Sequence, residues 1–152
     1  MKSTPVYFYV QRTSNYDSVG SRIPFQIERL NIGGAMNLGS GTFTAPRSGT
    51  YFFSVSATVV MPQDEGSGNL HVAFVLNGSH IGRANGNSQT GIYMNGDEWE
   101  TLSFQSTLNL KSGDAVWLTI TSKADACYLR GEYYINFTGW LLQEDITPQL
   151  NI

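Results

Sequence analysis

The densest group of side chains able to bind a metal ion is a short acidic run. Asp97, Glu98 and Glu100 place three carboxylates within four residues. Carboxylate oxygens are the ligands that Ca²⁺ prefers. The run lacks the regular alternation of ligands found in an EF-hand loop, and solvated loop charges are the alternative interpretation. The segment therefore predicts either a calcium site or a charged loop without a ligand.

Catalytic chemistry finds little support in the residues. His71 falls within a predicted strand and His80 in the loop after a predicted turn, and the two match no metalloprotease spacing. Cys127 is the single cysteine, so an intramolecular disulfide cannot form, and a nucleophilic role would need a positioned histidine that nothing suggests. Phosphate-binding, dinucleotide-binding and serine-nucleophile motifs do not occur. We therefore expect a protein that is not an enzyme.

Composition narrows the class of protein further. The chain has 152 residues, a formal charge of −3, 14% charged residues and 12% aromatic residues. This length suits one domain that buries roughly 70% of the surface of its unfolded chain. So few charges argue against disorder and against a long solvated helix. Nine Lys and Arg residues and the lack of a long apolar run indicate neither nucleic-acid binding nor membrane insertion.

Almost every segment alternates apolar and polar residues with period two, which is typical of half-buried β-strands. The strands expected on this pattern span residues 51–60, 70–76, 101–110, 115–120 and about 133–142. Asn77-Gly78 predicts a hairpin turn, and residues 78–96 are expected to form a loop that carries one short strand. The pattern predicts an all-β sandwich or closed barrel over residues 6–145, between tails at 1–5 and 146–152.

Two of the expected strands are apolar on both faces. In the last one, Phe137 and Leu141 alternate with Trp140 and Leu142, while Gly139 leaves room for a neighbouring ring or strand. A two-layer sandwich covers only the inner face of each sheet. Either the core is thick with some exposed aromatic residues, or the outer face of one sheet is buried in an oligomer. Among the turns, Asp114 is expected to cap its own turn.

Several blocks in order resemble the complement C1q-type globular domain. They are the spaced pattern Phe25, Asn31, Phe43 and Gly49-Thr50-Tyr51-Phe52-Phe53, the run SGTFTAPRSGTYFF at 40–53, HVAFVLNG at 71–78, LNLKSGDAVWL at 108–118 and FTGWLL at 137–142. Met36 and Val55 depart from the signature but stay apolar. The resemblance implies a ten-stranded jelly-roll sandwich related to tumour necrosis factor, assembled as a compact homotrimer. It also implies an acidic residue associated with calcium where Glu100 stands.

The resemblance implies a secreted, non-enzymatic recognition module of innate immunity, similar to stalkless invertebrate domains that bind sialic acid. No Gly-X-Y repeat occurs. The amino terminus has no hydrophobic signal region, so either the protein is cytosolic or, as the resemblance to secreted proteins implies, a leader is absent from this numbering. Glycans or microbial and cell-surface ligands are the expected partners, and the candidate contacts are Arg83, Asn85, Asn87, Gln89, Tyr93 and Trp99. The alternative is a protein ligand of the tumour-necrosis-factor or synaptic-organiser kind that binds a cell-surface receptor.

Overall fold

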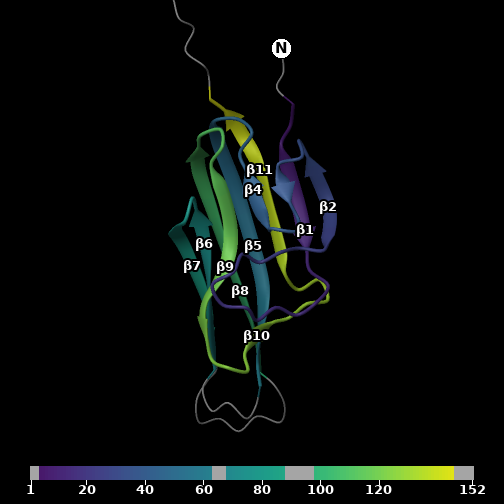
Figure 1. Cartoon of the computed structure of the whole chain (residues 1–152), viewed down its shortest axis with the longest axis vertical. Coiled ribbons are helices and arrows are strands. Elements are labelled where there is room, and N and C mark those ends of the chain that lie inside the picture. The colour runs from purple at the N-terminus through teal and green to yellow at the C-terminus, as the bar shows by residue number, and fades with distance from the viewer. Residues whose placement is uncertain (1–3, 63–67, 88–97, 146–152) are drawn as a thin grey trace, which may run out of the picture.

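The computed structural model describes residues 4–62, 68–87 and 98–145, which form two antiparallel β-sheets packed face to face (Figure 1). The strands are β1 (Tyr7–Gln11), β2 (Ile27–Ile32), β3 (Met36–Asn37), β4 (Thr42–Thr44), β5 (Gly49–Met61), β6 (Asn69–Leu76), β7 (Ser79–Asn87), β8 (Glu98–Leu110), β9 (Ala115–Lys123), β10 (Tyr128–Leu129) and β11 (Asn136–Glu144). The predicted all-β jelly roll is confirmed. The described ranges hold eleven strands when β3 and β10, which are two residues long each, are counted. Within these ranges no helix is long and apolar enough to cross a membrane.

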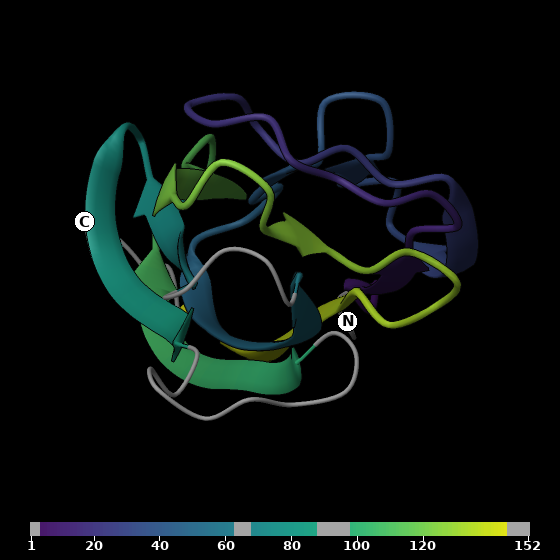
Figure 2. The same ribbon diagram turned by 90° about the horizontal axis from the view of Figure 1, so that it is seen from below.

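Each of the two sheets has an inner face that packs against the other sheet and an outer face that points away from it. In the sheet called here the β5 sheet, β5 pairs with β8 on one side and with β11 and then β10 on the other, and β1 and β2 follow β11. The β6 sheet has the order β3-β4-β9-β6-β7. Figure 2 looks along the strands and shows β7 and β8 meeting at one corner. In Figure 1, β1 begins and β11 ends at the same end of the sandwich, with β10 at the other.

The core between the sheets is an aromatic cluster. The predicted alternation in β5 is confirmed, since Tyr51, Phe53 and Val55 are at most 2% exposed. The ring of Phe53 lies 5.3 Å from that of Phe74 and 5.6 Å from that of Phe43, both of which belong to the opposite sheet. Aromatic pairs at such separations add about 0.5–1.5 kcal/mol each beyond their buried area. The cluster therefore fixes the distance between the two sheets.

Strand β7 corrects the expectation of a loop over residues 78–96. Nine residues of that span, Ser79–Asn87, form a strand paired with β6, so His80 is on a strand and not in a loop. The inward positions are Gly82, Ala84 and Gly86, which pair with buried residues of β6. A Cβ at Gly86 would lie 3.0 Å from Cγ2 of Val59 on the other sheet. The sheets converge here, so the inward residues are small and the usual apolar alternation is missing.

The loop between β10 and β11 corrects the expected start of the last strand. Residues from Tyr133 onward were expected to be extended, but β11 begins at Asn136. Glu132 and Tyr133 have φ values of 53° and 70°, a left-handed region that few non-glycine residues adopt. The carbonyls of Thr13 and Arg12 hold them there by accepting their N–H groups at 3.0 and 2.9 Å. These partners lie far earlier in the chain, so no local pattern predicts the conformation.

Arg12 makes the base of this loop rigid. Its guanidinium is buried and donates hydrogen bonds to the carbonyl oxygens of Pro24 at 2.7 Å and Ser14 at 3.1 Å. Burial lowers the pKa of Arg12 from its ordinary value, because a charged group loses hydration inside the fold. The backbone of Tyr133 is therefore held by a buried arginine that is itself fixed by hydrogen bonds.

The turn between β8 and β9 is held by Asp114. Its carboxylate accepts hydrogen bonds from the N–H of Lys111 at 2.8 Å and from Nδ2 of Asn77 at 3.0 Å. The hydrogen bond from the N–H of Lys111 is the main reason that the pKa of Asp114 lies below its ordinary value. The predicted capping role of Asp114 is present in the structure.

Substituting Asp114 by alanine is expected to lower the free energy of unfolding by about 1 kcal/mol at pH 7. Because its pKa is lower in the folded chain, the carboxylate stabilises the fold above its unfolded-state pKa, and that stabilisation is lost as the pH falls through the folded-state value. Urea unfolding of the unmodified protein and of Asp114→Ala measures this difference in the free energy of unfolding. The measurement is made at pH 7 and then at successively lower pH values below about 3.9. A difference in the free energy of unfolding that stays constant over these pH values would contradict a role for the ionised carboxylate.

Candidate functional site

The outer face of the β5 sheet carries large apolar side chains that the described residues leave exposed. Trp140 and Leu142 of β11 are 38% and 53% exposed, and Leu30 and Ile32 of β2 are 45% and 39% exposed. Alternation puts Phe137 and Leu141 of the same β11 strand on the core side. The outer face is thus apolar in the two strands that flank β1, as the sequence pattern of the last strand indicates.

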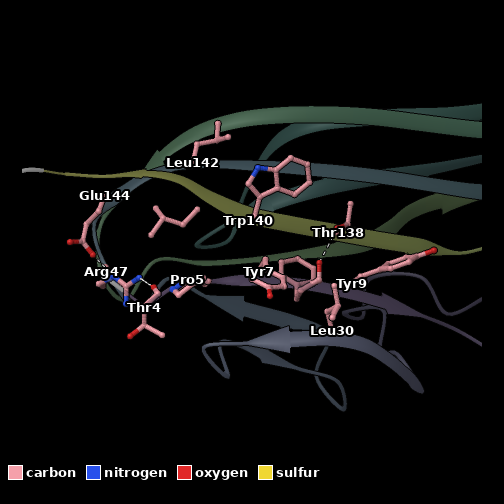
Figure 3. Close-up of a pocket in the computed structure, with 13 residues that line it drawn as sticks. Thr4, Pro5, Tyr7, Tyr9, Leu30, Arg47, Thr138, Trp140, Leu142 and Glu144 are labelled. Carbon is pink, nitrogen blue, oxygen red and sulfur yellow. Dashed lines mark hydrogen bonds and ion pairs between the residues drawn. The ribbon is translucent and has the colours of Figure 1, made fainter. Parts of the chain in front are cut away.

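Trp140, Leu142 and Leu30 form the rims of a groove of about 620 Å³, called here the apolar groove. Figure 3 shows Trp140 and Leu142 on one side and Leu30 on the other, with Tyr7 and Tyr9 of β1 between them. At one end of the groove the guanidinium of Arg47 contacts Glu144 and donates to the carbonyl of Thr4 (Figure 3). The groove is therefore an apolar channel with a fixed ion pair at its end.

Next to the groove the same face becomes polar. Oδ1 of Asn136 accepts hydrogen bonds from Nε2 of Gln11 at 2.6 Å and from the hydroxyl of Tyr9 at 3.1 Å. The side chains of Ser54 and Ser56 lie beside them around a hollow of about 310 Å³. A partner that covers this face would meet apolar contacts over β11 and β2 and directional hydrogen bonds over β5 and β1.

The structure separates the predicted ligand-binding residues onto different sheets. Arg83 and Asn85 are exposed on the outer face of the β6 sheet, and Asn87 is the last residue of the same strand. Trp99 is 48% exposed and pairs with Val60 on β5, so it lies on the outer face of the other sheet. The remaining two predicted contacts, Gln89 and Tyr93, lie outside the described residues. Arg83 and Asn85 share a surface, and Trp99 does not belong to it.

Trp99 has neighbours that the sequence analysis did not include. Its ring meets that of Tyr134 edge to face, with centroids 5.6 Å apart, and the guanidinium of Arg130 lies 5.4 Å from its centroid. Arg130 also forms an ion pair with Glu132 at 2.9 Å. Tyr134, Arg130 and Glu132 all belong to the β10–β11 loop, whose left-handed backbone turns Tyr133 and Tyr134 to solvent. No signal near Trp99 in the sequence points to that loop.

The predicted calcium ligands are described only in part. Glu98 and Glu100 lie two residues apart on β8 and are half-buried, so their side chains leave the same face of the strand. Asp97 lies outside the described residues. Among residues 4–62, 68–87 and 98–145, no three His, Cys, Asp or Glu side chains gather closely enough to hold a metal ion. A calcium site here depends on Asp97 or on further ligands.

Cys127 and the histidines have the surroundings of structural residues. Cys127 is fully buried, so its thiol is shielded from solvent and from a substrate. His71 is half-buried on β6 opposite Asn85, and Nδ1 of the exposed His80 lies 3.4 Å from Nη2 of Arg83. These groups do not meet as a nucleophile and a base would.

Comparison with known proteins gives one consistent result. The family model described as the C1q domain matches residues 7–142. Human complement C1q tumor necrosis factor-related protein 3 is 30% identical over 141 residues, which are 91% of this chain and 52% of that protein, and the mouse protein is 28% identical with the same coverage. Zebrafish caprin-2 is 28% identical over 145 residues, or 92% of this chain and 14% of that protein. The chain thus spans about half the length of the first relatives and a small part of the other.

Two solved structures share the fold. The globular domain of zebrafish complement 1qA superposes with a TM-score of 0.69 at 16% identity, over 92% of this chain and 99% of that one. The Eiger TNF structure from S. frugiperda has a TM-score of 0.69 at 12% identity, over 99% and 100% of the two chains. At these identities the likeness shows the fold and the order of the strands.

Proposed function

The chain belongs to the C1q domain family, and on that premise we propose that it is a non-enzymatic, extracellular recognition module that acts as a homotrimer. The observation that carries the proposal is the apolar groove with exposed Trp140 and Leu142 on the outer face of the β5 sheet. A surface of this kind is characteristic of an interaction site. The division into a domain at 6–145 with two tails stays a prediction.

Three copies cover this surface through the same contact repeated around an axis. The face of one copy then receives a different part of its neighbour, and such a heterologous contact closes into a ring when its rotation fits. Asn136, Gln11 and Tyr9 already hydrogen-bond one another within the chain, so a neighbouring subunit can cover this part of the face without leaving these groups unpaired. Assembly as a trimer would bury both apolar faces of the last strand.

The ligands that we propose are glycans or other groups on microbial and host cell surfaces, by analogy with lectin-like relatives of this domain. Arg83 and Asn85 support this, because exposed guanidinium and amide groups recognise sugar hydroxyl and acid groups. The other candidate contacts remain Asn87, Gln89, Tyr93 and Trp99. Three equivalent sites on one trimer raise the overall affinity for a clustered ligand through effective concentration.

A glycan array probed with the purified protein, with and without Ca²⁺, tests the proposal. We expect signals for a restricted set of sugars, and we expect them to weaken when the protein is diluted below the concentration at which it assembles. An array silent for every sugar would contradict the glycan proposal. Capture of one cell-surface receptor at nanomolar affinity without competition by sugars would favour the alternative.

That alternative is a receptor-binding protein ligand, and the cluster of Trp99, Tyr134 and Arg130 favours it. Trp, Tyr and Arg are the residue types enriched at the energetic centres of protein interfaces. Replacing Trp99 by alanine separates the two functions. Loss of receptor binding with unchanged array signals would support a protein ligand, and loss of array signals would support a glycan contact.

Calcium binding by Asp97, Glu98 and Glu100 stays part of the proposal. Carboxylates two positions apart on β8 present oxygens to one side, as a Ca²⁺ ligand set requires. Binding only to the folded protein would raise the melting temperature on addition of Ca²⁺. Titration calorimetry and melting in chelator measure this, with Glu100→Gln as the variant expected to abolish the shift. No heat and an unchanged melting temperature would remove the calcium site.

A further inference from the structure

The strands of the β6 sheet carry no carboxylates. The chain has twelve Asp and Glu residues, yet β3, β4, β6, β7 and β9 contain none of them. The nearest in sequence to β9 are Asp114 and Asp125, which lie in the turns at its two ends, and Asp114 is held by Lys111 and Asn77. In a protein of net charge −3, a sheet without acidic residues is a local departure from the average charge.

Basic and hydrogen-bonding side chains gather on the outer face of this sheet. In the β6–β7 register, His71 pairs with Asn85, Ala73 with Arg83, and Val75 with His80. The alternate residues of β6 face the core and are buried, so these pairs face outward. Both histidines of the chain and the arginine of β7 therefore lie on one surface.

A second arginine extends this surface toward β9. Trp117 pairs with Val75 and so faces outward, and the guanidinium of Arg22 lies 3.8 Å from the centroid of its indole ring. Nη1 of Arg22 donates to Oγ1 of Thr42 at 2.9 Å, which holds the stack against the sheet. Between the two arginines the floor is formed by Ala73 and Val75, which are at most 2% exposed. We call this surface the basic face; its members are Arg22, His71, His80, Arg83, Asn85 and Trp117.

We propose that the basic face binds a linear acidic polysaccharide that carries sulfate groups along its length. The positions from His71 to Val75 span roughly 13 Å of strand, and the two arginines come from separate parts of the chain, Arg83 from β7 and Arg22 from the segment between β1 and β2. Separated cations with no carboxylate between them complement a repeated negative charge better than a single small anion. The indole ring of Trp117 keeps the guanidinium of Arg22 stacked in place on this face.

This inference rests on the proposed recognition function and names its ligand class and its place. The basic face belongs to the sheet opposite the apolar groove, so an assembly through the groove leaves it exposed. A trimer would present three copies of it, which suits a long polymer that touches more than one site.

The probe is a fully sulfated heparin dodecasaccharide, with the same oligosaccharide after desulfation as its comparison, in surface plasmon resonance on the full chain. We expect Arg83→Gln and Arg22→Gln each to weaken binding about tenfold, since a charge-assisted hydrogen bond contributes at least that factor. Arg83→Lys keeps the charge and is expected to restore most of the affinity. Lys111→Gln removes the same charge from an exposed turn away from the basic face and is expected to bind as the unmodified protein does.

Four outcomes would overturn the proposal. A dodecasaccharide bound equally by Arg83→Gln and the unmodified protein would overturn it, as would equal binding of the desulfated sugar. Light scattering and melting curves identify a variant that has lost its fold or assembly, and if Arg83→Gln is such a variant, Arg22→Gln replaces it as the deciding comparison. If the protein binds neutral glycans on the array but does not bind heparin, this inference fails and the proposed recognition function stands. If the array is silent and heparin does not bind, both this inference and the proposed glycan function fail.

Discussion

Replacing Leu142 by arginine is expected to leave a folded monomer of 16.8 kDa where the unmodified chain forms a trimer. Leu142 is 53% exposed at the rim of the apolar groove and does not belong to the core cluster. The substitution therefore leaves the sandwich intact. It places a charge where the neighbouring subunit would bury it without a partner, which costs more than an apolar contact returns.

The matched control is Ile81→Arg. Ile81 is 40% exposed on β7, which belongs to the other sheet, so the same charge appears on a surface outside the proposed assembly. Size-exclusion chromatography with light scattering gives the mass of each variant, and far-ultraviolet dichroism checks the fold. A Leu142→Arg protein that keeps the mass of the unmodified assembly, or an Ile81→Arg protein that loses it, would contradict the assignment of the groove.

Substituting Gly139 by alanine is expected to lower the free energy of unfolding by about 3 kcal/mol, the upper end of the usual range for overpacking. A Cβ at this position would lie 2.6 Å from Cδ1 of Phe53 and 2.8 Å from Cε1 of Phe8. Both rings are at most 1% exposed and are held in the aromatic cluster, so neither can move aside without losing contacts. The predicted close approach of a ring at Gly139 is therefore present in the structure.

Gly39→Ala is the control for this substitution. A Cβ at Gly39 would meet Oδ1 of Asn37 at 3.6 Å, which is an ordinary contact. Urea unfolding at one fixed protein concentration compares the variants, because assembly makes apparent stability depend on concentration. An equal midpoint for Gly139→Ala and the unmodified protein would show that the core around Phe53 has room that the structure does not indicate.

The strands with a large apolar residue at every second position could be predicted from sequence. In β5 the buried Tyr51, Phe53 and Val55 alternate with side chains of the outer face, so the local pattern carries the information. Strand β7 could not be predicted in the same way. Its inward residues Gly82 and Gly86 are small because the other sheet lies close to them, and that closeness comes from the tertiary fold.

The candidate site was predictable only within one strand. Arg83 and Asn85 are two residues apart on a strand, so they share a face by local geometry alone. Their neighbours His71 and Trp117 come from other strands through the register of the sheet. Trp99 was grouped with Arg83 because both lie in one polar stretch of sequence. In the structure this stretch contributes strands to two different sheets. The local sequence pattern of a strand does not determine which sheet it joins.

The mass of the unmodified chain in solution tests most directly whether three copies cover the outer face of the β5 sheet. Analytical ultracentrifugation at micromolar concentration is expected to give about three times 16.8 kDa, and Trp140 fluorescence, read in a chain with Trp99→Phe and Trp117→Phe, is expected to be shielded from a soluble quencher. A single species of 16.8 kDa with Trp140 open to the quencher would contradict it, and recognition by three clustered sites would then have no basis.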